Sequence, residues 1–75
     1  MDIKRLITMA NQIAANIAPG KADAAATEDV ASHLKRFWDP RMRRQLIAFV
    51  NEDGGTGLNP VALKALHRLQ EDKTD

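Results

Sequence analysis

The chain has 75 residues, a formal net charge of +1, no cysteine and 44% hydrophobic residues. This length allows one small domain, and such domains have little stability to spare, so they commonly rely on disulfides, metals or partners. The lack of cysteine excludes disulfides and thiolate zinc sites. We therefore expect a protein partner to supply the missing stability.

The beginning of the chain, MDIKRLITMANQIAANIAP, alternates polar and apolar positions and has no continuous apolar run of the signal-peptide kind. No stretch approaches the roughly 18 consecutive apolar residues of a membrane span. These observations predict a cytoplasmic protein without membrane contact.

The first predicted helix covers about residues 3–18. Its apolar side chains fall within one arc of about 120° on a helical wheel, which is typical of an amphipathic helix. Asp2 is a suitable N-cap, and Pro19 with Gly20 ends the run. The members of this apolar face are Ile3, Leu6, Ile7, Ala10, Ile13, Ala14 and Ile17.

The second predicted helix covers about residues 24–38. Either Asp23 or Thr27 could cap it, so the alanine run 24–26 is either its first turn or part of the preceding loop, although alanine favours the helix. Its expected core face consists of Val30, Ala31, Leu34, Phe37 and Trp38.

The third and fourth predicted helices, about residues 40–51 and 60–70, each begin with a capping residue followed by proline, in WDP and in NP. The glycine-rich stretch EDGGTG separates them. The expected core residues are Met42, Leu46, Phe49 and Val50 in the third helix and Leu63, Leu66 and Leu69, flanked by Val61 and Ala62, in the fourth. Residues 71–75 are expected to be a frayed tail.

No segment alternates as a β-strand would, so the predicted fold class is all-α, a small compact domain of three to four short helices over residues 1–75. Periodicity leaves two arrangements open, a compact bundle and an orthogonal array of helices.

Catalytic and metal sites are not expected in this chain. It has a single serine, Ser32, and two histidines far apart in sequence. Asp29 and His33 lie one helical turn apart, but two ligands do not make a metal site, and such residues are more typical of a polar helix surface. The glycine stretch lacks the strand and the lysine of a phosphate-binding loop and is interpreted as a helix connection.

Positive charge is concentrated in residues 35–44, KRFWDPRMRR, which hold five cations and one acid. On a helical wheel Arg41, Arg43 and Arg44 spread around the helix, whereas a DNA-recognition helix would concentrate them. The low net charge also argues against nucleic acid. Arginine and tryptophan are enriched at protein interfaces, which favours a docking surface. Phe37 and Trp38 could both be core residues, and a core position is favoured more for Phe37, with Trp38 at the rim of the interface.

Three segments resemble the delta subunit of soluble, NAD-dependent, molybdenum-containing formate dehydrogenase. They are LITMANQIAANIAP, HLKRFWDPRMRRQLIAFV and GGTGLNPVALKAL, in that order. The middle segment is the most specific, because a string such as FWDPRMR has no generic structural reason to occur.

The resemblance implies a non-catalytic subunit that stabilises or assembles the large molybdenum-containing subunit of a complex that oxidises formate and reduces NAD⁺. The family's molybdenum cofactor, iron–sulfur clusters and FMN would lie on other subunits, and none would bind here. Alternatives are a transient accessory for maturation and cofactor insertion, or a small nucleic-acid-binding domain. The residues expected to bind the partner are Phe37, Trp38, Pro40, Arg41, Met42, Arg43 and Arg44, with Asn11 and Gln12 as a second polar patch.

Overall fold

The structure is a computed structural model that describes residues 2–71. Within this range the chain forms four α-helices and no strand, which confirms the predicted all-α class. No helix here is long and apolar enough to cross a membrane. The helices are α1 (Ile3–Ile17), α2 (Asp23–Phe37), α3 (Pro40–Asp53) and α4 (Pro60–Glu71). Residue 71 of the expected frayed tail belongs to α4, and the remainder, 72–75, lies outside the described residues.

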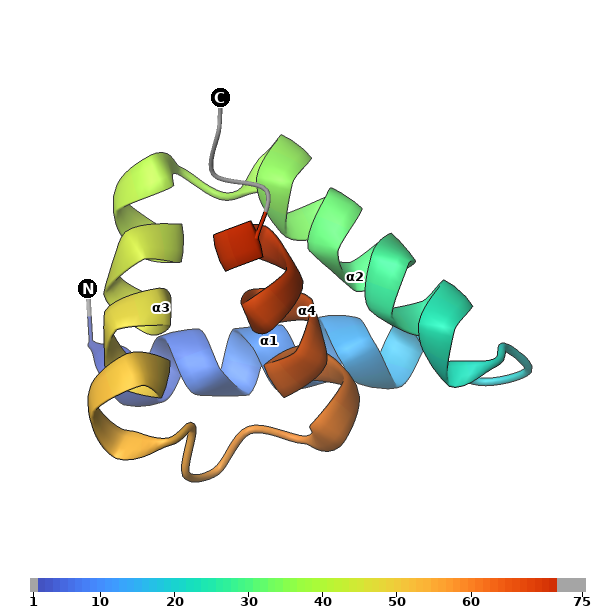
Figure 1. Ribbon diagram of the computed structural model, residues 1–75, viewed down its shortest axis with the longest axis horizontal. Coiled ribbons are helices and arrows are strands. Elements are labelled where there is room, and N and C mark those ends of the chain that lie inside the picture. Colours follow the sequence, from blue (N-terminus) through green and yellow to red (C-terminus); the bar gives the residue numbers. More distant parts are fainter. Residues whose placement is uncertain (1, 72–75) are drawn as a thin grey trace.

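The helices cross one another instead of running side by side as in an up-and-down bundle (Figure 1). α4 lies between α2 and α3, and α1 passes across the other three. α4 contacts every other helix, most extensively α2. Of the two arrangements left open by the sequence, the structure is therefore the crossed array.

Side-chain caps define the beginnings of three helices. Asp2 accepts a hydrogen bond from the N–H of Lys4 at the start of α1, and Asp39 accepts one from the N–H of Arg41, 2.8 Å away, at the start of α3. Asn59 does the same for α4 through the N–H of Ala62. Each cap satisfies a backbone donor that the first helical turn leaves without a partner.

The beginning of α2 differs from both options considered for it. The N-cap position is Ala22, which makes no side-chain capping bond, and Asp23 is the first helical residue. Thr27 lies inside the helix, so the alanine run is helical. Alanine has the highest helix propensity, and a carboxylate in the first turn interacts favourably with the helix dipole, so this helix begins without a cap.

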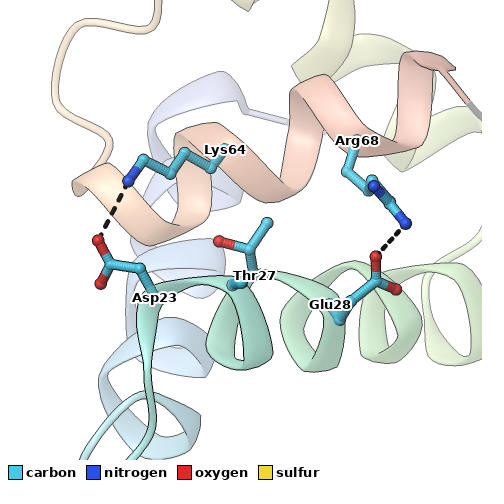
Figure 2. A pocket seen from close by; sticks show the side chains of 6 residues that line it. Asp23, Thr27, Glu28, Lys64 and Arg68 are labelled. Carbon is cyan, nitrogen blue, oxygen red and sulfur yellow. Dashed lines mark hydrogen bonds and ion pairs between the residues drawn. The ribbon is translucent and has the colours of Figure 1, made fainter.

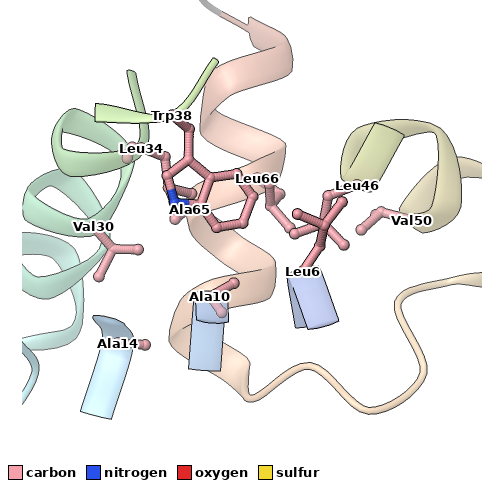
Figure 3. Close-up of a cluster of buried hydrophobic side chains, with 12 residues drawn as sticks. Leu6, Ala10, Ala14, Val30, Leu34, Trp38, Leu46, Val50, Ala65 and Leu66 are labelled. Atoms are coloured by element: carbon pink, nitrogen blue, oxygen red, sulfur yellow. The ribbon is translucent and has the colours of Figure 1, made fainter. Parts of the chain in front are cut away.

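The core is formed by one cluster to which all four helices contribute (Figure 3). In α4 the fully buried residues are Ala62, Ala65 and Leu66, whereas Leu63 and Leu69 are only partly buried at its edges. The predicted leucine stripe is therefore confirmed at its centre, Leu66, and its two outer members pack at the edge of the core. The small side chains beside Leu66 allow α4 to approach α2 closely. The other buried members of the cluster are Leu6, Ala10, Ala14, Val30, Ala31, Leu34, Trp38, Leu46 and Val50.

The loop between α3 and α4 depends on glycine. Gly54, at the C-cap of α3, and Gly55 both have positive φ angles, of 90° and 87°. A Cβ atom built on Gly54 meets nothing within 4 Å, whereas one built on Gly55 would lie 2.6 Å from Cδ1 of Leu63. Gly55 is therefore favoured by its backbone conformation, and a Cβ atom there would also displace the Cδ1 methyl group of Leu63.

We expect Gly55→Ala to lower the free energy of unfolding by about 2–4 kcal/mol, from the left-handed backbone together with the steric clash. Gly54→Ala, the matched control, has only the backbone penalty of about 1–2 kcal/mol. Urea denaturation followed by circular dichroism measures both. Equal losses for the two variants would contradict the packing role of Gly55.

Candidate functional site

The candidate site is the corner where α2 ends and α3 begins, residues 36–44, called here the α2–α3 corner. Trp38 is 6% exposed and points into the core cluster, which also contains Leu34 and Leu66 (Figure 3). Phe37 is 69% exposed. The expectation that Phe37 points inward and Trp38 lies at a rim was therefore wrong. Trp38 is the buried residue and Phe37 the exposed one.

The burial of Trp38 in place of Phe37 follows from the spacing of the buried residues. Val30, Leu34 and Trp38 form one row with a spacing of four residues, and such a row is continuous on a helix surface. Phe37 lies at the edge of that row, on the side of His33. A helical wheel does not distinguish these neighbouring positions, because the helices packed against α2 determine which of them is covered.

The exposed ring of Phe37 is held by two neighbours on α2. Its centroid lies 4.8 Å from that of His33, and the guanidinium carbon of Arg36 lies 5.7 Å from it in a cation–π contact. A shallow groove beside these three residues extends toward Lys21 and the end of α1 at Ile17. Among residues 2–71, Phe37 is the one large hydrophobic residue whose side chain is exposed.

Arg43, on α3, connects the two helices of the corner through hydrogen bonds to backbone carbonyl groups at the end of α2. Its guanidinium Nη1 donates to the carbonyl oxygens of Leu34, Lys35 and Trp38, at 3.3, 2.6 and 3.3 Å. The carbonyl of Leu34 also accepts from the N–H of Trp38, so Arg43 adds a second donor at the end of α2. A cation at this end of a helix also interacts favourably with the helix dipole. This residue, expected to contact a partner, thus has a structural role that its position on the wheel did not indicate.

The other residues of the corner divide by exposure. Pro40, Arg41 and Arg44 are exposed, and Met42 is partly buried against the core. Among residues 2–70 no carboxylate pairs with Arg41 or Arg44, and Oδ1 of Asp39 accepts a hydrogen bond as the cap of α3. The corner therefore presents two arginines without acidic partners on α3, and an exposed aromatic ring in contact with Arg36 at the end of α2.

The two residues of the expected second patch, Asn11 and Gln12, differ in their contacts within the fold. The carboxamide of Asn11 donates to the carbonyl oxygen of Gly57 and accepts from the N–H of Asn59, both at 2.8 Å. It therefore joins α1 to the loop before α4. Gln12 is exposed. Only the long-range hydrogen bonds show this role of Asn11, and the sequence carried no signal for it.

A second groove lies between α2 and α4 (Figure 2). Ion pairs close both ends of it, Asp23 with Lys64 at 3.2 Å and Glu28 with Arg68. Thr27 lies between them, and its buried hydroxyl has no hydrogen-bond partner. The charged groups along this groove pair with each other, so the groove offers no unpaired charge to a ligand. The ion pairs instead connect α2 to α4.

Backbone groups of the glycine-rich loop between α3 and α4 are also used in hydrogen bonds within the chain. Asp53 accepts from the N–H of Thr56 at 3.1 Å, and Leu58 donates to the carbonyl of Gly55. Hydrogen bonds from the hydroxyl and the N–H of Thr56 lower the pKa of the Asp53 carboxyl below its ordinary value. An anion-binding loop needs free N–H groups, so these bonds favour a plain connection between helices.

A family model described as the NADH-dependent formate dehydrogenase delta subunit, FdsD, matches residues 5–66. The chain belongs to this family. The match spans most of the 75 residues and confirms the resemblance carried by the three sequence segments. Comparisons with curated proteins and with solved structures gave no match.

The residues of this chain do not fit the iron–sulfur clusters implied by the formate dehydrogenase family. Iron–sulfur clusters are held by cysteine thiolates, and the chain has no cysteine. Within residues 2–71 no three His, Asp or Glu side chains come together as a metal site. Glu28 and Asp29 are instead paired with Arg68 and Lys21, and His33 packs on Phe37.

The reversed positions of the two aromatic residues have a direct consequence for stability. We expect Trp38→Ala to lower the free energy of unfolding by about 3–5 kcal/mol, because it leaves a cavity in the core, and to unfold much of the population. Phe37→Ala, the matched control, should change it by less than about 1 kcal/mol. Circular dichroism during urea denaturation measures both, and a larger loss for Phe37→Ala would contradict the assignment.

Arg43 and Arg44 form a second matched pair. Arg43→Met should lower the free energy of unfolding by about 1–2 kcal/mol, because three carbonyl oxygens at the end of α2 lose a charged donor. Arg44→Met should change it by no more than about 0.5 kcal/mol, as for other exposed positions. Equal stabilities of the two variants would show that Arg43 does not fasten the corner.

Proposed function

We propose that this chain is a non-catalytic accessory subunit that binds the molybdenum-containing subunit of an NAD-dependent formate dehydrogenase and stabilises or assembles it. Family membership supports the enzyme complex. The observation that carries the docking role is the α2–α3 corner, where Phe37 is 69% exposed beside unpaired arginines.

The exposure of Phe37 favours a protein interface. Its ring is already ordered by His33 and Arg36, so little side-chain freedom is lost when a partner covers it. Aromatic residues and arginine are the side chains that most often anchor interfaces. Phe37 is therefore the proposed anchor of the docking surface.

The residues of the corner then divide into two roles. Phe37, Pro40, Arg41 and Arg44 are exposed and are the proposed contacts, with Met42 at their edge. Trp38 and Arg43 have supporting roles, because buried Trp38 fills the core and partly exposed Arg43 joins α2 to α3. Both are needed for docking because they hold the proposed contacts in place.

On α1, exposed Gln12 stays a predicted contact of a second, smaller patch. The carboxamide of Asn11 is occupied within the chain, so its contribution to docking is the position of the adjoining loop.

Co-purification tests the proposal. With an affinity tag on this chain in the native host, Phe37→Ser should reduce recovery of the molybdenum-containing subunit at least tenfold, while circular dichroism of the isolated variant stays that of the wild type. Thr8→Ser, an exposed change on α1, is the control and should recover the subunit normally. Undiminished recovery with Phe37→Ser would contradict the proposed anchor.

The same preparation separates a stable subunit from a maturation accessory. A subunit should be present in stoichiometric amounts in complexes that reduce NAD⁺ with formate. Recovery only with enzyme that lacks its cofactors, and loss from active enzyme, would instead establish a transient accessory.

A further inference from the structure

Arginines without acidic partners lie at the α2–α3 corner. Three cations elsewhere pair with acids across the surface, Lys21 with Asp29, Lys64 with Asp23 and Arg68 with Glu28, whereas Lys4 and Arg5 at the start of α1 form no such pair within residues 2–70. Within the same range, Arg36, Arg41 and Arg44 also have no acidic partner. What distinguishes the corner is that these unpaired cations occur together with an exposed large aromatic ring, that of Phe37.

The groups at the corner that carry negative or partial negative charge make other contacts within the fold. The carboxylate of Asp39 accepts from the backbone N–H of Arg41 as the cap of α3. The carbonyl oxygens at the end of α2 carry partial negative charge, and Arg43 occupies three of them. Within residues 2–70, the remaining arginines therefore form no ion pair, and their charge is available to a partner that covers the corner.

The arrangement of these side chains indicates what such a surface must contain. Arg41 and Arg44 are three residues apart on α3, so they lie on neighbouring positions of one helix face. Arg36 lies against the ring of Phe37 on α2. Buried arginines require paired carboxylates, and a buried phenyl ring requires an apolar recess.

From these observations we infer that the partner surface that receives the α2–α3 corner is rich in carboxylates, and that these surround an apolar recess for Phe37. The inference rests on the proposed docking function and adds the chemistry of the partner. Charges at the rim of an interface act mainly on association and its salt dependence, whereas the aromatic anchor acts on the lifetime of the complex.

The test is the dissociation constant between purified chain and formate dehydrogenase prepared without it, measured by biolayer interferometry at 50 and 300 mM NaCl. Wild-type Kd should rise about tenfold or more over this range, because salt screens the exposed charges. The double variant Arg41→Gln with Arg44→Gln should raise Kd about five- to tenfold at 50 mM NaCl and flatten its salt dependence.

A matched control removes the same charge elsewhere. Lys4→Gln with Arg5→Gln changes two exposed cations in the first turn of α1 and should leave Kd within twofold of the wild type. If the enzyme does not accumulate without this chain, the same contrast is measured as retention of each variant in co-expressed complexes after washes of increasing salt.

The outcomes separate this inference from the proposed function. Salt-independent binding that Arg41→Gln with Arg44→Gln leaves unchanged, but that Phe37→Ser abolishes, would overturn the carboxylate-rich partner surface and retain the docking subunit. Absence of any binding to the enzyme would contradict both. Salt-dependent binding to duplex DNA or RNA in place of the enzyme would also contradict both and establish a nucleic-acid-binding domain.

Discussion

The structure depends on the insertion of Trp38 into the core directly before the chain turns. The chain changes direction after α2 at Asp39 and Pro40, which begin α3. The buried indole ring of Trp38 fixes where this turn lies relative to the other helices. In a chain of 75 residues, one side chain of this size is a large part of the apolar area that can be buried. The bonds from Arg43 to the last carbonyls of α2 then hold the two helices at that turn.

The proposed docking surface is a consequence of the same turn. Because Trp38 takes the buried position, Phe37 is left at the edge of the apolar row of α2 and outside the core. Asp39 caps α3, and within residues 2–70 none of the arginines around it forms an ion pair. The surface therefore requires no special element of its own, since the residues that end one helix and begin the next produce it. A small domain of this kind gains stability when a partner covers that surface.

Local rules predicted the helices well and their packing less well. Caps and prolines placed the starts of α3 and α4, because a cap depends only on residues a few positions away. The order of Phe37 and Trp38 and the buried alanines of α4 depend on how closely other helices approach, which periodicity does not contain. The roles of Asn11 and Arg43 come from hydrogen bonds to backbone atoms distant in sequence. The docking residues themselves were predicted from composition and resemblance, and the fold divides them into surface and support.

The central claim is that the α2–α3 corner meets the molybdenum-containing subunit. The most direct measurement places a photo-cross-linking phenylalanine derivative, p-benzoylphenylalanine, at position 37 in one preparation and at position 25 in another, and identifies the cross-linked protein in the intact complex by mass spectrometry. We predict a cross-link from position 37 to the molybdenum-containing subunit and none from position 25, which lies exposed near the start of α2. Cross-links from position 25 alone, or from position 37 to no subunit of the enzyme, would contradict the account.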